Sequence, residues 1–309
     1  MPPRTRAAIL LFLILALLAV VSIALYVWTT DITERFPRRV NGSAAVPVKP
    51  KPVLYVGVVS RYPPPVIYHG YQPIVDYLTE RTPYHFELRP AGTYQDAVDM
   101  LVKGEATAAF LGTYIYLRAH DRSGVRAILK PLNENGEPYS RSVLITRTGS
   151  PIWSVKDLAG KRLAMPSQDS FSGNWLPMAE FPRAGFTGRT MPVVRHFSHH
   201  HSVVYQVLRG TFDAGVVKER VAREFMNRDL RIVLSSTPIP GSPLVVGKDC
   251  DTTVVREICS ALLAIDVRRA VDRELVGQWD QEFRYGFAPA TESDFAGIRG
   301  VLHAQGRRP

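Results

Sequence analysis

Cysteine is scarce in this sequence: of 309 residues only Cys250 and Cys259 carry a thiol. They form neither a C-x-x-C pair nor a set of four ligands, so the sequence predicts no thiolate metal site. We interpret both as core thiols, with a disulfide between them as the alternative in an oxidising compartment.

Signals for nucleotides and nucleic acids are missing as well. No Gly-Lys-Ser/Thr ends the turn that follows Arg162–Met165, which excludes a Walker loop there. The net charge is +10, yet the basic residues are scattered and accompany no aromatic-rich RNA motif or zinc-finger spacing. A positive net charge alone is a weak sign of nucleic-acid binding. We predict no nucleic-acid partner, no cofactor and no metal.

A long apolar stretch lies near the N-terminus. Residues Ala7–Trp28 carry no charge and are about as long as the ~20 residues that a bilayer span requires. The stretch ends in aromatic residues rather than in a small-residue cleavage site, which favours an uncleaved anchor over a signal peptide. Arg4 and Arg6 predict that the N-terminus lies inside. We therefore expect a single-pass inner-membrane protein with its folded part in the periplasm.

The rest of the chain alternates between strands and helices. Apolar runs predict strands at Val53–Val59, Ala108–Leu111 and Arg162–Met165, each followed by a helical segment. This alternation is typical of a mainly parallel sheet covered on both faces. We expect crossings between two lobes near residues 143–148 and 234–243. The predicted organisation is an anchor (1–30), a Pro-, Ala- and Lys-rich tether (31–52), the first part of lobe 1 (53–145), lobe 2 (146–235), and a hinge return with C-terminal helices that complete lobe 1 (236–309).

Two stretches share one layout, YQDAVDMLVKGEATAAFLGT at Tyr94–Thr113 and SHHHSVVYQVLRGTFDAGVVKE at Ser198–Glu219. In each, an amphipathic helical run ends at a glycine and leads into a strand of small residues. Two similar α/β units indicate two lobes that face one ligand.

The turn after Arg162–Met165 is the first candidate site. Ligands of open α/β sheets bind at the carboxyl ends of strands, and this turn reads SQDSFSG. Its backbone N–H groups and the hydroxyls of Ser170 and Ser172 are suited to an anion. The alternative is an ordinary helix N-cap, for which Ser and Asp are preferred.

Three consecutive histidines, His199 to His201, open the later repeated helix. Adjacent residues point in different directions on a helix or a strand, so all three cannot readily ligate one metal. Either they are exposed polar residues or one of them caps a ligand pocket. Tyr94, which opens the earlier helix, is either a packing residue or a hydroxyl donor reaching across the cleft.

These motifs, in this order, resemble the substrate-binding proteins of phosphate, phosphite and phosphonate ABC transporters, which have the type II periplasmic binding fold. The resemblance runs from about Val53 to Phe295 and includes YQPIVDYL, GEATAAFLG, SVKDLAGKRLA, SQDSFSG and PIPGSPLVV. It implies that Ser170 and Ser172 hold the oxyanion of the ligand. It further implies a role for Tyr94 and for the histidine that opens the later helix, which matches His200, with His201 as the shifted alternative.

Three positions depart from the family pattern. A second family tyrosine falls on Ser140, with Tyr139 one place off. The acidic residue with which phosphonate-specific members bind an amino group matches Ser242, which cannot pair with an ammonium. Phe171 replaces a small hydroxyl residue between the two serines. The resemblance still implies an oxyanion ligand, but these changes argue against an aminoalkylphosphonate.

We therefore expect an α/β, two-lobed type II periplasmic binding protein with an N-terminal transmembrane helix. It would capture phosphate, phosphite or a phosphonate by closing its lobes and serve an ABC permease. The alternative is a membrane-tethered sensing module for a partner such as a sensor kinase. A phosphate-ester hydrolase with His200 as base and Ser170 or Ser172 as nucleophile is disfavoured, because no acidic partner for the histidine lies at a recognisable spacing. We predict no enzyme activity.

Overall fold

The structure, a computed structural model, describes residues 13–25, 50–59 and 64–304. The chain divides into two compact units, residues 1–50 and 51–309. In the first unit, the described residues form a helix over 13–25. This helix lies within the expected span Ala7–Trp28, whose two ends fall outside the described residues, as does the tether over 31–49. Within the described ranges, no helix has both the length and the apolar character needed to cross a membrane.

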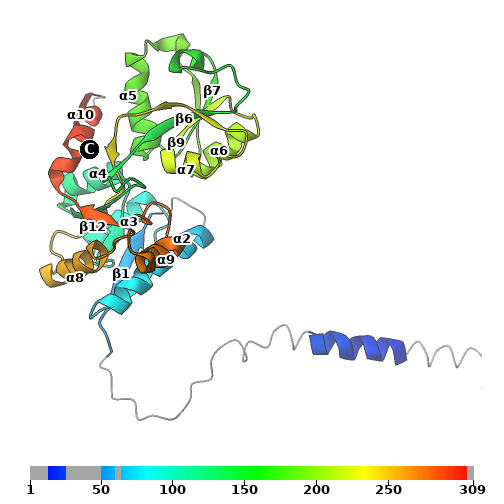
Figure 1. The fold of residues 1–309 in the computed structure, drawn as a ribbon, viewed down its shortest axis with the longest axis vertical. Coiled ribbons are helices and arrows are strands. Elements are labelled where there is room, and N and C mark those ends of the chain that lie inside the picture. Colours follow the sequence, from blue (N-terminus) through cyan, green and yellow to red (C-terminus); the bar gives the residue numbers. More distant parts are fainter. Residues whose placement is uncertain (1–12, 26–49, 60–63, 305–309) are drawn as a thin grey trace, which may run out of the picture. The chain divides into compact units, whose positions relative to one another are not determined.

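The described residues between 51 and 304 build two lobes, each around its own sheet (Figure 1). The sheet of the first lobe has six strands in the order β13-β4-β12-β3-β1-β2. The neighbouring strands β3, β1 and β2 are parallel, with β2 at the edge of the sheet, while β12 and β13 run antiparallel to their neighbours. The strands are β1 (Val53–Val58), β2 (His85–Pro90), β3 (Ala108–Phe110), β4 (Arg126–Pro131), β12 (Leu244–Val246) and β13 (Phe287–Pro289).

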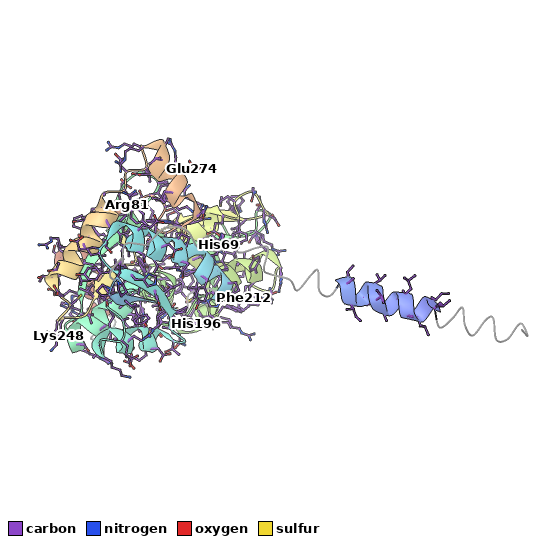
Figure 2. All side chains as sticks on the ribbon, turned by 90° about the horizontal axis from the view of Figure 1, so that it is seen from below. His69, Arg81, His196, Phe212, Lys248 and Glu274 are labelled. Carbon is purple, nitrogen blue, oxygen red and sulfur yellow. The ribbon has the colours of Figure 1, made fainter. Side chains whose placement is uncertain are left out.

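Helices cover both faces of this first sheet. Along β3, Ala108 and Phe110 belong to one buried cluster and Ala109 and Leu111 to another, as expected for a strand that is covered on both faces. The helices of the lobe are α2 (Pro64–Arg81), α3 (Tyr94–Val102), α4 (Thr113–Ser123), α8 (Thr252–Leu263), α9 (Ala270–Leu275) and α10 (Ala296–Ala304), with 3₁₀ turns at Val276–Gln278 and Glu292–Phe295. Charged side chains such as Arg81, Lys248 and Glu274 are exposed at its surface (Figure 2).

The second lobe holds a five-stranded sheet in the order β10-β6-β9-β7-β8. Its strands are β6 (Ser142–Thr146), β7 (Arg162–Met165), β8 (Val193–His196), β9 (Ala214–Lys218) and β10 (Arg231–Ser235). Its helical segments are α5 (Leu176–Arg183), α6 (His200–Leu208), α7 (Glu219–Arg223), a π-helical turn at Phe171–Trp175, and 3₁₀ turns at Val155–Leu158 and Gly188–Thr190. Helix α6 packs closely on β9, because a Cβ on Gly215 would lie only 2.6 Å from Val203 Cγ1. The glycine of the FDAG motif therefore allows the helix to approach the strand.

Two short strands form the hinge between the lobes. β5 (Tyr139–Ser140) pairs antiparallel with β11 (Ile239–Pro240), so the two connections run side by side. The second connection falls in the predicted segment 234–243. The first was predicted near 143–148 and lies earlier, because residues 142–146 pair with both β9 and β10 and are buried as a central strand of the second sheet. The predicted boundary between residues 145 and 146 thus falls inside β6.

Two of the antiparallel strands, β6 and β12, each directly follow one of the hinge crossings. The chain enters the second lobe along β6 and returns to the first along β12, and each of these strands runs against its neighbours in the sheet. The sheets are therefore mixed rather than uniformly parallel. After β12 the described chain contains the α-helices α8, α9 and α10, in keeping with the C-terminal helices that the sequence predicted.

The lobes touch on one side of the hinge. Phe171 and Leu176 of the second lobe belong to the same buried cluster as Ala109 and Leu111 of the first. The rings of Tyr114 and Trp175 pack with their centroids 5.0 Å apart. These contacts bring the turn before α5 against the first lobe, beside a small cavity between the lobes.

Candidate ligand-binding site

A cavity of about 30 Å³ lies between the lobes, beside the hinge. On this measure a single water requires roughly 10–15 Å³, so the space suits a small group rather than a sugar or a nucleotide. Most of the predicted site residues line it, namely Tyr94, Ser140, Ser170, Phe171, Ser172, His200 and Ser242.

Several helix N-termini meet at this cavity. Tyr94, Thr113 and His200 are the first residues of α3, α4 and α6, and Ser170 is the N-cap of the π-helical turn. The first N–H groups of a helix lack partners within the helix, and the helix dipole places partial positive charge at the same end. The cavity is therefore electrostatically suited to an anion.

The SQDSFSG turn is held in place by its own hydrogen bonds. Ser170 Oγ accepts a hydrogen bond from the backbone N–H of Gly173 over 3.0 Å, and the carbonyl of Ser172 accepts one from Ser142 Oγ over 2.6 Å. A Cβ on Gly173 would lie 1.9 Å from Pro166 Cγ. Only glycine fits at this position without displacing the proline, so the turn depends on the local sequence.

Asn174 and His196 brace the same turn from behind. Asn174 Nδ2 donates to the carbonyl of Gln168 over 2.9 Å, and its Oδ1 lies 2.9 Å from His196 Nε2. Burial lowers the pKa of His196 below its usual value of 6.5. A neutral imidazole therefore supports the turn at neutral pH.

His200 presents one ring nitrogen to the cavity. Its Nδ1 accepts a hydrogen bond from the backbone N–H of Lys218 over 3.2 Å, and its Nε2 lies 3.5 Å from Ser170 Oγ. Because Nδ1 acts as an acceptor, the ring proton resides on Nε2, which faces Ser170 and the cavity. His200 thus supplies a neutral N–H donor beside the serine turn.

Lys218 was not predicted as a site residue. It ends β9, is buried, and lines the cavity. Its Nζ donates to Ser242 Oγ over 2.9 Å and forms an ion pair with Glu282 of the first lobe. The rule that ligands lie at the carboxyl ends of strands could have indicated Lys218. Nothing in the sequence pattern indicated Glu282, because the two residues are 64 positions apart.

Two predicted residues lie outside the cavity. His201 Nε2 lies 2.8 Å from Oε2 of Glu224, the C-cap residue of α7. The ring of His201 is therefore directed to the end of α7 rather than to the ligand cavity. Successive residues on a helix point about 100° apart, which is why His200 and His201 cannot both face the site. Tyr139 is 46% exposed and lines a larger cavity on the other side of the hinge. Phe171 lines the small cavity and also packs into the cluster that joins the lobes.

The fold and the site define a two-lobed α/β binding protein of the periplasmic type, with a small cavity between lobes that a two-stranded hinge connects. Over residues 56–295 the chain matches the family described as "ABC transporter, phosphonate, periplasmic substrate-binding protein". It belongs to this family. The described domain is accordingly extracytoplasmic, and its functional class is solute binding for an ABC transporter.

Individual relatives agree with this assignment. A protein of Mycolicibacterium smegmatis named "Phosphate-import protein PhnD" is 24% identical over 262 residues, covering 77% of this chain and 81% of that protein. Among solved structures, PhnD1 of Prochlorococcus marinus in complex with methylphosphonate has a TM-score of 0.72 at 16% identity, covering 83% of this chain and 99% of that one. The binding-protein component of a phosphonate ABC transporter of Pseudomonas aeruginosa has a TM-score of 0.70 at 17% identity, covering 82% and 87%.

Proposed function

We propose that this protein captures a small phosphate-like oxyanion, namely phosphate, phosphite or a phosphonate, in the cavity between its lobes and presents it to an ABC permease. The observation that supports this most directly is the set of donors around the cavity. The N-termini of α3, α4 and α6 converge there, beside Ser170, Ser172 and the Nε2–H of His200. Such an array stabilises a buried anion by hydrogen bonds and dipoles.

The names of the relatives support the same ligand class. One relative is named for phosphate import, and another crystallised with methylphosphonate. Both ligands are small tetrahedral oxyanions, in keeping with a cavity of about 30 Å³. These names also favour transport over the sensing and hydrolase alternatives.

Closure of the lobes is the mechanism that this arrangement supports. Tyr94 and Thr113 approach the cavity from the first lobe, and Ser170, Ser172 and His200 approach it from the second. A ligand that bonds to both sets lowers the free energy of the closed form relative to the open one. Rotation about the paired strands β5 and β11 is a hinge motion of the usual kind.

A ligand screen tests this proposal. The full chain is heated with phosphate, phosphite, methylphosphonate, amino acids or sugars, and its melting temperature is recorded. A ligand at one hundred times its dissociation constant stabilises a protein by about 2.7 kcal/mol, so the oxyanions should raise the melting temperature clearly. A response confined to amino acids or sugars would contradict the proposal.

A single-pass membrane anchor also forms part of the proposal. The charge-free stretch Ala7–Trp28 and the arginines ahead of it support this. The protein should sediment with membranes and resist extraction by alkaline carbonate. Recovery of a soluble mature form that begins near Asp31 would show that the stretch is cleaved instead.

A further inference from the structure

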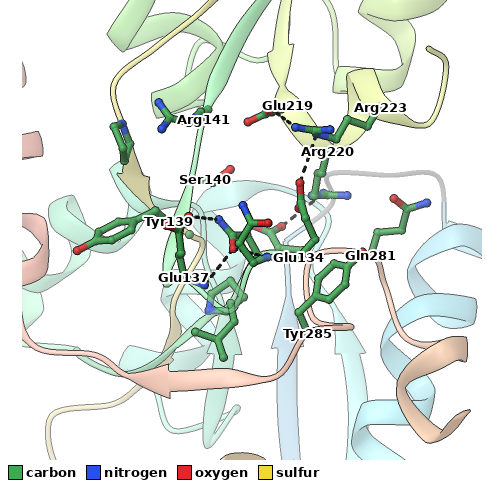
Figure 3. A pocket seen from close by; sticks show the side chains of 17 residues that line it. Glu134, Glu137, Tyr139, Ser140, Arg141, Glu219, Arg220, Arg223, Gln281 and Tyr285 are labelled. Carbon is green, nitrogen blue, oxygen red and sulfur yellow. Dashed lines mark hydrogen bonds and ion pairs between the residues drawn. The ribbon is translucent and has the colours of Figure 1, made fainter. Parts of the chain in front are cut away.

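The ligand cavity has a larger neighbour across the hinge. A second cavity of about 160 Å³ lies between the lobes, with Ser140 of the hinge, Arg220 and Arg223 of the second lobe, and Tyr285 of the first lobe around it (Figure 3). Ser140 lines both cavities. The two cavities are therefore adjacent at the hinge, and the side chains between them form the wall that separates them.

An ion pair forms part of this wall. Lys218 lines the ligand cavity, Glu282 lines the second cavity, and the two side chains form an ion pair. Lys218 belongs to β9 in the second lobe, whereas Glu282 precedes β13 in the first. The pair thus lies between the cavities and also connects the lobes.

Glu282 and Ser242 surround the ammonium of Lys218. The Oε1 atom of Glu282 pairs with Lys218 Nζ and lies 3.3 Å from the backbone N of Ser242, and its Oε2 lies 3.4 Å from Arg220 Nη2. Ser242 Oγ accepts from Lys218 Nζ over 2.9 Å. Glu282 and Ser242 are only 6% and 2% exposed. The buried carboxylate and the buried hydroxyl together hold the ammonium of Lys218, while Arg220 lies at the other oxygen of the carboxylate.

We propose that Lys218 is a specificity-determining residue. Its ammonium occupies the place beside Glu282 and Ser242 that an ammonium on a ligand would take, and so it restricts the site to small oxyanions without a cationic substituent. This inference rests on the proposed oxyanion function and narrows its substrate class.

Both space and charge support this restriction. The ligand cavity measures about 30 Å³, so an aminoalkyl arm on the ligand would have to extend into the neighbouring cavity of about 160 Å³. Lys218 helps to separate the two cavities. A second ammonium close to Lys218 is repelled, since little water lies between buried groups to screen the two charges. The same ammonium attracts an oxyanion. Lys218 therefore favours methylphosphonate over 2-aminoethylphosphonate on both grounds.

Isothermal titration of the full chain with these two phosphonates tests the inference. The wild type should bind methylphosphonate at least about tenfold more tightly than 2-aminoethylphosphonate. A difference of this size corresponds to roughly one charged contact. Lys218→Ala should bind 2-aminoethylphosphonate at least about tenfold more tightly than the wild type does, because the ligand's ammonium takes the vacated place beside Glu282. Lys218→Met removes the charge but keeps the space filled, so it should show no such gain. Lys248→Ala, at an exposed lysine remote from this wall, is the matched control.

The outcomes separate the two proposals. If the wild type binds neither phosphonate nor phosphate, the oxyanion function itself fails. If the wild type binds 2-aminoethylphosphonate as tightly as methylphosphonate, the function stands and the role of Lys218 is overturned. A gain in Lys218→Ala that persists when Glu282→Gln is added also overturns it, because the carboxylate would then not be the partner. The wild-type comparison can overturn the role of Lys218 even if Lys218→Ala does not fold.

Discussion

The backbone N–H of Lys218 donates to Nδ1 of His200 over 3.2 Å, and this bond determines which ring nitrogen carries the proton. With Nδ1 occupied as an acceptor, Nε2–H faces Ser170 and the cavity. The end of β9 therefore orients the imidazole at the start of α6. The end of β9 and the start of α6, which follow each other in the sequence, thus both lie at the cavity.

Replacing His200 should weaken ligand binding. His200→Ala removes an N–H donor aimed at the cavity, and a bond of this kind to a charged group contributes about 1.5–3 kcal/mol. Titration with methylphosphonate should show at least about tenfold lower affinity. His201→Ala is the control, because that ring contacts Glu224 instead, and its affinity should change by less than about threefold. Equal losses in both variants would contradict this assignment.

Replacing Gly173 should disrupt the SQDSFSG turn. In Gly173→Ala the new methyl group would lie 1.9 Å from Pro166 Cγ, so the turn or the proline must move. Overpacking of this kind costs about 1–3 kcal/mol, and we expect both a lower melting temperature and weaker methylphosphonate binding. Gly149→Ala, where the methyl group meets nothing within 4 Å, serves as the control and should resemble the wild type.

Removing the hydroxyl of Ser142 should lower the free energy of unfolding of the protein. Its Oγ donates over 2.6 Å to the carbonyl of Ser172, and the bond is buried. In Ser142→Ala that carbonyl loses its donor, which costs about 1–3 kcal/mol. Urea unfolding should show the loss, whereas Ser198→Ala at an exposed position should not. If the two variants unfold alike, this bond does not contribute to stability.

Acid should weaken the protein through His196. Burial lowers the pKa of this imidazole below 6.5, so the folded state disfavours the charged ring. Above the pKa of the unfolded chain the ring is neutral in both states and the full stability is present. As the pH falls below about 6.5 the unfolded chain takes up the proton first, and stability is lost until the pH has passed the lowered folded pKa.

The measurement is urea unfolding at about pH 7 and about pH 5. The free energy of unfolding should fall less in His196→Gln than in the wild type. His85→Gln, at an exposed histidine, should keep the wild-type pH dependence. A wild-type slope that survives in His196→Gln would assign the effect to another group.

Local pattern determined much of this protein. Strand β7 (Arg162–Met165) has the predicted bounds, and its buried part, Leu163–Met165, is the continuous apolar run expected of a strand covered on both faces. The SQDSFSG turn and the start of α6 could also be predicted from the sequence, because capping residues and close-packed glycines act on their immediate neighbours. These features placed most of the predicted site residues around one cavity.

Tertiary structure decided the rest. The first lobe crossing lies at β5 rather than in β6, because only the pairing of β6 with β9 and β10 shows that it is a central strand. The ion pair between Lys218 and Glu282 joins residues 64 positions apart on different lobes. Such a contact leaves no periodic signal, since it depends on how two lobes meet and not on which face of one element is buried. The sequence therefore predicted a small anion site, whereas the packing of the lobes decided which charged residues lie beside the cavity.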